Sequence, residues 1–187
     1  GLCGIIAPLI ALSLIALSIS QSLSWFRWTE NALSDLAGIQ ATTTAATIFN
    51  SGLIICGLLS IIFALGLMQI LRQRILGFIG TFILALVDVS LYAIGAFPET
   101  AGSIHTYVSV AFFTLFPISL FFIGASMIGE KSERTLGFAT ILCGIFAVIV
   151  ATPIILVKVD DVGVHELLAI LPSIVWSIVF GVKLYRV

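Results

Sequence analysis

The sequence predicts an all-α integral membrane protein, a single domain built as a bundle of six transmembrane helices. Its 187 residues are 60% hydrophobic and only 9% charged, whereas a soluble domain carries about 25% charged residues. The mean hydropathy of +1.27 is far above that of a water-soluble chain. The few charges also divide the chain into six largely uncharged stretches, each near the length of about 20 residues that a helix needs to cross a bilayer.

The six spans are predicted in order from the gaps between charged residues. The first lies before Arg27, and a polar stretch at 42–44 precedes the second. The third contains Asp88, and the remaining three follow the acidic and basic loops of the second half. The predicted spans cover residues 2–23, 46–70, 75–97, 105–128, 136–157 and 164–184.

The basic residues predict the orientation of the bundle, because cytoplasmic loops of membrane proteins are enriched in Lys and Arg. Six basic residues fall on one side of the predicted spans: Arg72, Arg74, Lys131, Arg134, Lys183 and Arg186. Only Arg27 and Lys158 fall on the other side. We therefore expect a multi-pass protein of the cell membrane with its N- and C-termini in the cytoplasm.

Composition and motif content exclude binding to nucleic acid or nucleotides. The net charge is −1 and no run of basic residues is present, so nothing complements a phosphate backbone. No Gly-rich phosphate loop occurs either. The three cysteines lack CxxC spacing, which argues against a thiolate metal site. We predict no cofactor, and we expect membrane lipids and other membrane subunits as partners.

The predicted outer face is acidic. It carries six of the nine acidic residues and both histidines: Glu30, Asp35, Glu99, Asp160, Asp161, Glu166, His105 and His165. A site on this face would attract cations or amines rather than anions. The alternative is a solvated acidic rim without a specific role, because most surface charges have none.

The first outer loop, residues 25–38, predicts a short amphipathic interfacial helix. Thr29 is a suitable N-cap and Gly38 a suitable C-terminal stop. Residues four apart are neighbours on a helix, so one face would carry Glu30, Asn31, Ser34 and Asp35, and the other Leu33, Leu36 and Ala37. The helix would either lie flat on the membrane or fold over the bundle mouth with its polar face inward.

The second and third outer loops each place an acid, a glycine and a histidine in that order. These residues are Glu99, Gly102 and His105 in one loop and Asp161, Gly163 and His165 in the other. Imidazoles and carboxylates ligate divalent metals and perform acid/base chemistry. A metal centre would use Asp35, Glu99, His105 and His165, and haem held by the two histidines is a further alternative. No HExxH motif supports either site.

Asp88 lies about 13 Å from the outer end of its predicted helix, near the bilayer midplane. A carboxyl group at this depth should face the bundle interior, because exposure to lipid is costly. Its candidate partners are Asn50, Ser51, Ser90 and Tyr92. The residues leave three interpretations open: a structural hydrogen bond between helices, a proton relay and a ligand anchor.

Several segments carry a resemblance to a known family. These are FRWTENALSDL at 26–36, IFNSGLI at 48–54, FPE at 97–99 with His105, and HELL at 165–168 through Trp176. In their order and spacing they resemble the mainly archaeal membrane-protein family catalogued as domain of unknown function number 998. The resemblance implies a six-helix fold and carries no assigned activity. It directs attention to Asn31, Ser34, Asp35, Asn50, Glu99 and Glu166.

Three functions follow from these observations. The first is a non-catalytic accessory or organising subunit of a membrane complex, which the scarcity of catalytic motifs favours. The second is a lipid-directed or metal-dependent enzyme at the outer leaflet, which requires the outer acids and histidines to converge. The third is a small proton-coupled transporter with Asp88 as the proton carrier, although the sixth span offers no acidic counterpart.

Overall fold

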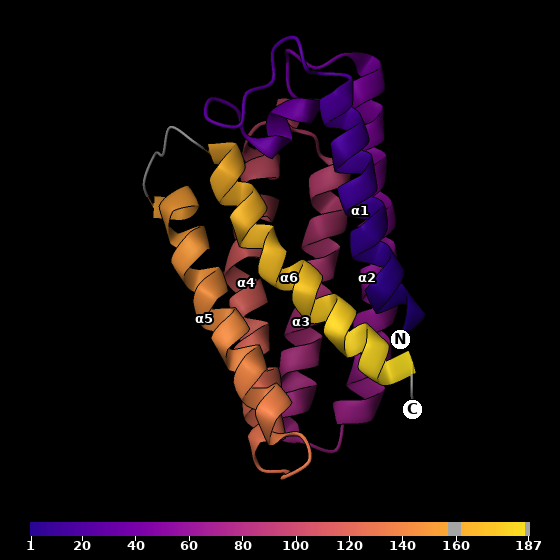
Figure 1. The fold of residues 1–187 in the computed structure, drawn as a ribbon, viewed down its shortest axis with the longest axis vertical. Coiled ribbons are helices and arrows are strands. Elements are labelled where there is room, and N and C mark those ends of the chain that lie inside the picture. Colours follow the sequence, from indigo (N-terminus) through magenta and orange to yellow (C-terminus); the bar gives the residue numbers. More distant parts are fainter. Residues whose placement is uncertain (157–161, 186–187) are drawn as a thin grey trace.

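The computed structural model describes residues 1–156 and 162–185, and within these residues the chain is helical without strands. Six long helices alternate with loops that contain two short 3-10 helices (Figure 1). The elements are α1 (Leu2–Ser20), η1 (Leu33–Ala37), α2 (Thr43–Leu71), α3 (Ile75–Ala96), η2 (Glu99–Ala101), α4 (Ser103–Ile128), α5 (Arg134–Leu156) and α6 (Val162–Tyr185). All six long helices are long and apolar enough to cross a membrane, which confirms the all-helical part of the predicted fold class with its six helices of spanning length.

The long helices begin and end within three residues of the predicted spans. Local capping explains part of this agreement. The Thr42 hydroxyl accepts a hydrogen bond of 3.1 Å from the amide of Ala45 and so begins α2, as expected for an N-cap threonine. Gly102, with φ of 66°, reverses the chain before α4, and this left-handed conformation is easily adopted only by glycine.

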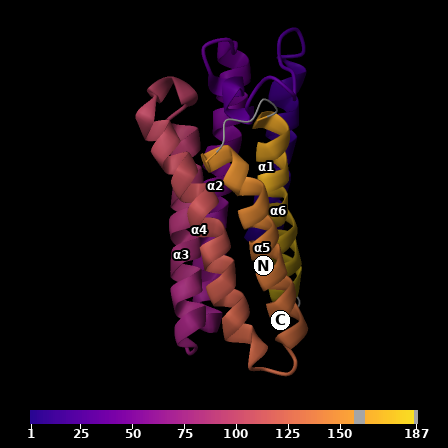
Figure 2. The same ribbon diagram turned by 90° about the vertical axis from the view of Figure 1, so that its left-hand side faces the viewer.

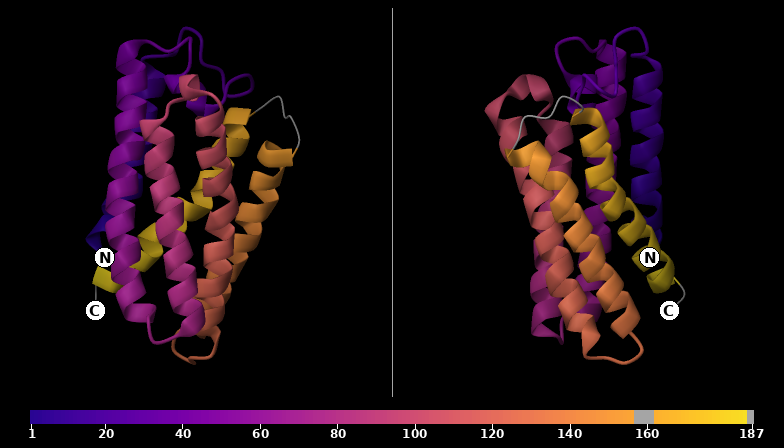
Figure 3. Two further views of the ribbon diagram at one scale, coloured as in Figure 1. Left: turned by 180° about the vertical axis from the view of Figure 1, so that it is seen from behind. Right: turned by 60° about the vertical axis from the view of Figure 1, so that its left-hand side comes forward.

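The six long helices form a closed ring. Each packs against the next in the chain, and α6 returns to contact α1. The helix α6 runs diagonally across the bundle (Figure 1), and the views of Figures 2 and 3 show it between α1 and α5. Near the chain ends, the Ser177 hydroxyl donates to the carbonyl of Gly4 at 2.8 Å. A Cβ on Gly181 would meet the backbone of Gly1 and Gly4 within 3.0 Å, so glycine permits this close approach.

One end of the ring, here called the basic end, carries the loops at 72–74 and 129–133 and the last turn of α6 (Figure 1). Glu133 binds Arg74 at 2.5 Å and Lys183 at 3.4 Å. Burial alone would raise the pKa of Glu133, but its hydrogen bonds and ion pairs with Arg74 and Lys183 outweigh burial and lower it. This cluster ties three helix ends together. Arg186 lies outside the described residues.

The opposite end, here called the carboxylate end, carries η1, η2 and the first turn of α6 (Figure 1). Glu30, Asp35, Glu99 and Glu166 all lie there, whereas Lys158, Asp160 and Asp161 fall outside the described residues. The second half of the predicted acid–glycine–histidine repeat is therefore only partly described.

The predicted interfacial helix from Thr29 is wrong in its start and its type. The helix begins at Leu33 and is a 3-10 helix of five residues. Residues 27–31 instead form a separate turn, because the Arg27 amide donates to the Asn31 side chain at 2.9 Å and the Asn31 amide to the Arg27 carbonyl at 2.9 Å. The helix η1 folds over the bundle, but it buries its apolar residues Leu33, Leu36 and Ala37 rather than its polar face.

Candidate functional site

The segment around η1 holds Asp35 in a fixed position. One oxygen of Asp35 accepts hydrogen bonds of 3.0 Å from the Ala32 amide and from the Asn31 side-chain amide. The first closes the N-terminus of η1, where backbone amides lack partners. Since Leu36 is fully buried on the other side of η1, the Asp35 carboxylate is directed away from the core.

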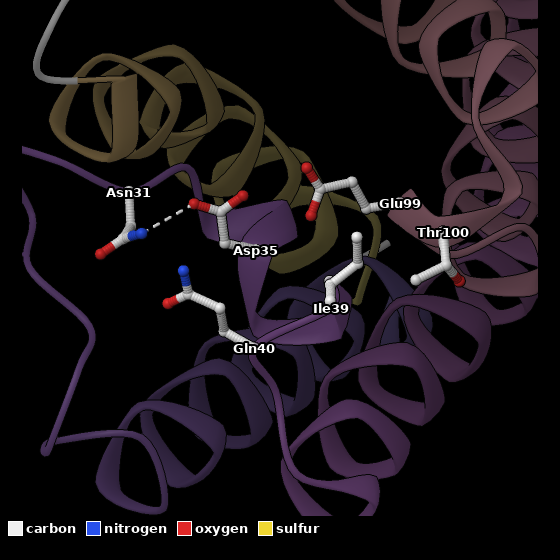
Figure 4. Close-up of a pocket in the computed structure, with 7 residues that line it drawn as sticks. Asn31, Asp35, Ile39, Gln40, Glu99 and Thr100 are labelled. Atoms are coloured by element: carbon white, nitrogen blue, oxygen red, sulfur yellow. Dashed lines mark hydrogen bonds between the residues drawn. The ribbon is translucent and has the colours of Figure 1, made fainter.

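Asp35 lines an open pocket of about 240 Å³ between η1 and the η2 segment. Figure 4 shows the Asn31 amide and the Glu99 carboxyl on opposite sides of the Asp35 carboxylate, with the Gln40 side chain pointing toward it from below. The lining residues are Asn31, Asp35, Gly38, Ile39, Gln40, Glu99 and Thr100. The pocket thus combines two carboxyl groups, two amides and a hydroxyl, and the described residues place no basic side chain in its wall.

The two carboxyl groups in this pocket perturb each other. Burial, the negative charge of Asp35 and hydrogen bonding to Asp35 raise the pKa of Glu99 from 4.5 to about 7. Two neighbouring carboxylates resist ionising together unless a cation reduces their repulsion. Near neutral pH, Glu99 therefore exchanges its proton readily, and a bound cation would favour the ionised form.

Gly38 brings the η1 backbone close to Glu99. A Cβ at this position would collide with a carboxylate oxygen of Glu99. Gly38 ends η1 as predicted, but its φ of −85° is available to any residue. Its role in the pocket is therefore steric, because it leaves room for the carboxyl group beside the backbone.

Glu166 supports η1 from below. Its carboxylate accepts a hydrogen bond of 2.5 Å from the Leu33 amide and another from the Ser34 amide. These are the first amides of η1, and a carboxylate satisfies such groups well. Ser34 and Glu166 line a narrower cavity on the core side of η1 and not the acidic pocket. Glu166 therefore positions the segment that carries Asp35.

The histidines do not line the acidic pocket. His105 is buried, its Nδ1 lies 2.8 Å from the Phe97 carbonyl, and its ring borders the cavity beneath η1. His165 is partly buried at the start of α6. Within residues 1–156 and 162–185, no three His, Cys, Asp or Glu side chains are grouped to hold a metal ion. The two acids of the suggested four-residue centre meet in the pocket without the histidines.

The other candidate residues lie apart from this pocket. Glu30 is exposed in the preceding turn, and Asn50 is partly buried on α2. Asp88 is buried in the ring, where its Oδ2 atom has no hydrogen-bond partner among the described residues; the same holds for Asn50 Oδ1. The Ser90 hydroxyl donates to the Leu86 carbonyl at 2.9 Å. The predicted partners thus leave Asp88 Oδ2 unsatisfied.

The comparison with known proteins identifies the family. A family model described as "Protein of unknown function (DUF998)" matches residues 5–183. The chain belongs to the DUF998 family. No curated protein and no solved structure matches it. The DUF998 match confirms the resemblance seen in the sequence, and the function has to be argued from the geometry.

Sequence reasoning missed part of the pocket of this DUF998 protein. Ile39, Gln40 and Thr100 line it but follow no recognised motif. Thr100 could have been proposed as the neighbour of Glu99, whereas no local signal marks Gln40. Gln40 reaches the pocket only because of the turn at Gly38, which brings the chain back past η1.

Proposed function

We propose that this protein is a membrane-embedded binding protein for a small ligand with an ammonium group, which the acidic pocket holds. The observation that supports this function is the meeting of Asp35 and Glu99 in a pocket of about 240 Å³. Ammonium groups donate charge-assisted hydrogen bonds to carboxylates. The neighbouring amides of Asn31 and Gln40 and the hydroxyl of Thr100 suit further polar groups on the ligand.

The proposed location is the cell membrane, with the acidic pocket on the outer side and both termini in the cytoplasm. The clustering of Arg72, Arg74, Lys131, Arg134 and Lys183 at the basic end supports this orientation, because cytoplasmic loops are rich in basic residues. An external acidic pocket would meet ligands from the surroundings or the head groups of lipids in the outer leaflet.

Binding should depend on pH, because the ligand competes with a proton on Glu99. Below pH of about 7 the Glu99 carboxyl is mainly protonated, and a neutral carboxyl attracts an ammonium group more weakly than a carboxylate does. The affinity for the ammonium group should therefore rise between about pH 6 and pH 8. A ligand without positive charge should show no such rise.

A titration of the detergent-solubilised protein with ethanolamine tests this proposal. Ethylene glycol, in which a hydroxyl replaces the ammonium group, is the matched control ligand. We expect binding of ethanolamine at about pH 8, weaker binding at about pH 6 and no binding of ethylene glycol. Isothermal titration calorimetry measures all three.

Two variants separate the pocket from general surface charge. Glu99→Gln should weaken ethanolamine binding by about tenfold or more, because one charge-assisted hydrogen bond contributes roughly 1.5–3 kcal/mol. Glu30→Gln removes an exposed acid of the loop that carries Asp35 and should leave the affinity unchanged. If both variants lost the same affinity for ethanolamine, the binding would reflect nonspecific surface charge. If the wild type bound ethanolamine and ethylene glycol equally, an ammonium site would be excluded.

The pocket favours ligand binding over the functions suggested by the sequence. The accessory-subunit role rests on the scarcity of catalytic motifs, and no contact of the described residues adds to it. The enzyme role uses the histidines, which lie outside the pocket. The transporter role centres on Asp88, which lies in a separate cavity.

A further inference from the structure

The closed ring of helices encloses an apolar cavity that is separate from the acidic pocket. The helix α6 packs mainly against its ring neighbours α1 and α5 and against η1. It does not pack closely against α2, α3 or α4, and the space between α6 and these three helices is filled only by side chains. Two adjoining cavities of about 90 and 70 Å³ remain there. Both are bordered by Ile15, Leu53, Leu91, Phe112 and Ile170.

This space extends from beneath η1 into the middle of the ring. Its upper part is bordered by His105 and Glu166, and its lower part by Asp88 and Trp176. A water-sized group takes up about 30 Å³ in a liquid, so the two parts together have room for about five groups of that size. That is enough for a stretch of hydrocarbon chain.

Asp88 is the unusual member of this wall. It is only 7% exposed, and its Oδ2 atom accepts no hydrogen bond from the described residues. The hydroxyls that border the same part of the cavity have other contacts. Ser173 donates to the Ile170 carbonyl at 2.7 Å and Ser177 to the Gly4 carbonyl at 2.8 Å, while the Ser60 hydroxyl lies 4.0 Å from the Cys56 thiol. Buried polar atoms in proteins rarely remain without a partner, because each one costs stability. A ligand with a donor group would satisfy this oxygen.

The composition of the wall restricts the chemistry of such a ligand. The described residues contribute no Lys or Arg side chain to either part of the cavity, and apart from Asp88, His105, Glu166 and a few small polar side chains the wall is aliphatic or aromatic. An ammonium group would have to be desolvated here at high cost, whereas a hydroxyl group brings a donor without a charge. The ligand should therefore be an apolar chain with a hydroxyl group.

The wall of the cavity includes side chains at the outer surface of the bundle. Leu12 on α1 and Ile174 on α6 border it and are partly exposed. In the bilayer these surfaces of α1 and α6 face lipid, which is where a long-chain alcohol resides. Entry between these two helices requires no passage through the acidic pocket.

We propose that this cavity binds a lipid-like alcohol, whose chain lies along the apolar wall and whose hydroxyl donates a hydrogen bond to Asp88 Oδ2. Of the three interpretations of Asp88 that the sequence leaves open, this proposal corresponds to the ligand anchor. This site is independent of the ammonium pocket, so the failure of either proposal leaves the other standing.

Quenching of Trp176 fluorescence tests the proposal, because Trp176 borders the cavity. The probe is a terminally brominated long-chain alcohol, and its methyl ether, which has no donor, is the control ligand. Trp25 and Trp28 are replaced by Phe in all samples so that Trp176 alone reports. We expect the alcohol to bind about tenfold more tightly than the ether, as one hydrogen bond implies.

Two substitutions at Asp88 complete the experiment. Asp88→Leu removes the acceptor and suits an apolar wall, so the variant should fold and should bind alcohol and ether equally. Asp88→Asn keeps an acceptor oxygen and should keep the preference for the alcohol. The proposal is overturned if the parent protein binds both probes equally, if the Leu variant still prefers the alcohol, or if neither probe quenches Trp176.

Discussion

Replacing Glu99 by glutamine should stabilise the protein at high pH and leave its stability unchanged at low pH. A glutamine is neutral at every pH and keeps a side-chain amide that can donate to Asp35. The wild-type carboxyl is protonated in both the folded and the unfolded state below about pH 4.5. The two proteins should therefore have similar stability there.

The difference between the two proteins develops as the pH rises. Between 4.5 and about 7 the unfolded chain releases the Glu99 proton while the folded protein retains it, and this favours unfolding of the wild type. The full rise in pKa corresponds to about 3 kcal/mol at about 1.4 kcal/mol for each pH unit. Glu99 is partly exposed, and solvent screening reduces this value to about 1 kcal/mol. Above pH of about 7 the difference should remain constant.

Thermal unfolding in detergent, followed by circular dichroism, measures this effect. At about pH 8 the midpoint of Glu99→Gln should exceed that of the wild type by roughly 2–4 °C, and at about pH 3.5 the two midpoints should coincide. Glu30→Gln is the control, because this exposed acid lies outside the pocket. A difference that is the same at both pH values, or that shrinks as the pH rises, would refute the proposed interaction between Asp35 and Glu99.

Two further substitutions address residues that position the pocket, and a third addresses the ion pairs of the basic end. Glu166→Ala should cost about 1–3 kcal/mol and speed amide hydrogen exchange at Leu33, whereas Glu166→Gln, which keeps an acceptor oxygen, should protect that amide more fully. Gly38→Ala should displace Glu99, because the added Cβ would meet its carboxylate, and calorimetry should show about tenfold weaker ethanolamine binding. Glu133→Gln should lower stability by about 1 kcal/mol at neutral pH. That loss should disappear as the pH falls through the lowered folded-state pKa of Glu133, which thermal unfolding at neutral and acidic pH would show.

The long helices were predictable because the signal for each one is local. A membrane-spanning helix satisfies its own backbone amides and carbonyls, so an uncharged stretch of sufficient length is enough to identify it. Charged residues such as Arg74, Glu130 and Arg134 mark the ends of these uncharged stretches. The predicted boundaries therefore lie within three residues of those observed. The ring arrangement was less accessible, since it depends on small residues such as Gly4 and Gly181 that let α1 and α6 meet.

The candidate site was predictable by residue type but not by arrangement. Asp35 and Glu99 were both expected on the same face of the protein, and they do line one pocket. From the sequence, His105 is as good a candidate for a metal ligand or an acid/base residue as the two acids are. In the structure its ring lies against the Phe97 carbonyl instead. Acids and histidines in separate loops carry no information on which of them will meet, because the loops between the helices decide this.

The segment between α1 and α2 shows why local reasoning failed there. Its backbone hydrogen bonds form a series of separate short turns, such as those from Asn31 to Arg27 and from Ala41 to Gly38. Amides between these turns need partners from side chains. The Ala32 amide finds one three residues away in Asp35, whereas the Leu33 amide finds one 133 residues away in Glu166. Neither the type nor the spacing of these residues within the loop predicts the second bond. By its charge Glu166 belongs with the outer acids, but its carboxylate accepts a hydrogen bond from the Leu33 amide and holds η1 in place. Because η1 carries Asp35, Glu166 also helps to position Asp35 in the pocket that it shares with Glu99, the arrangement on which the proposed binding of an ammonium group rests.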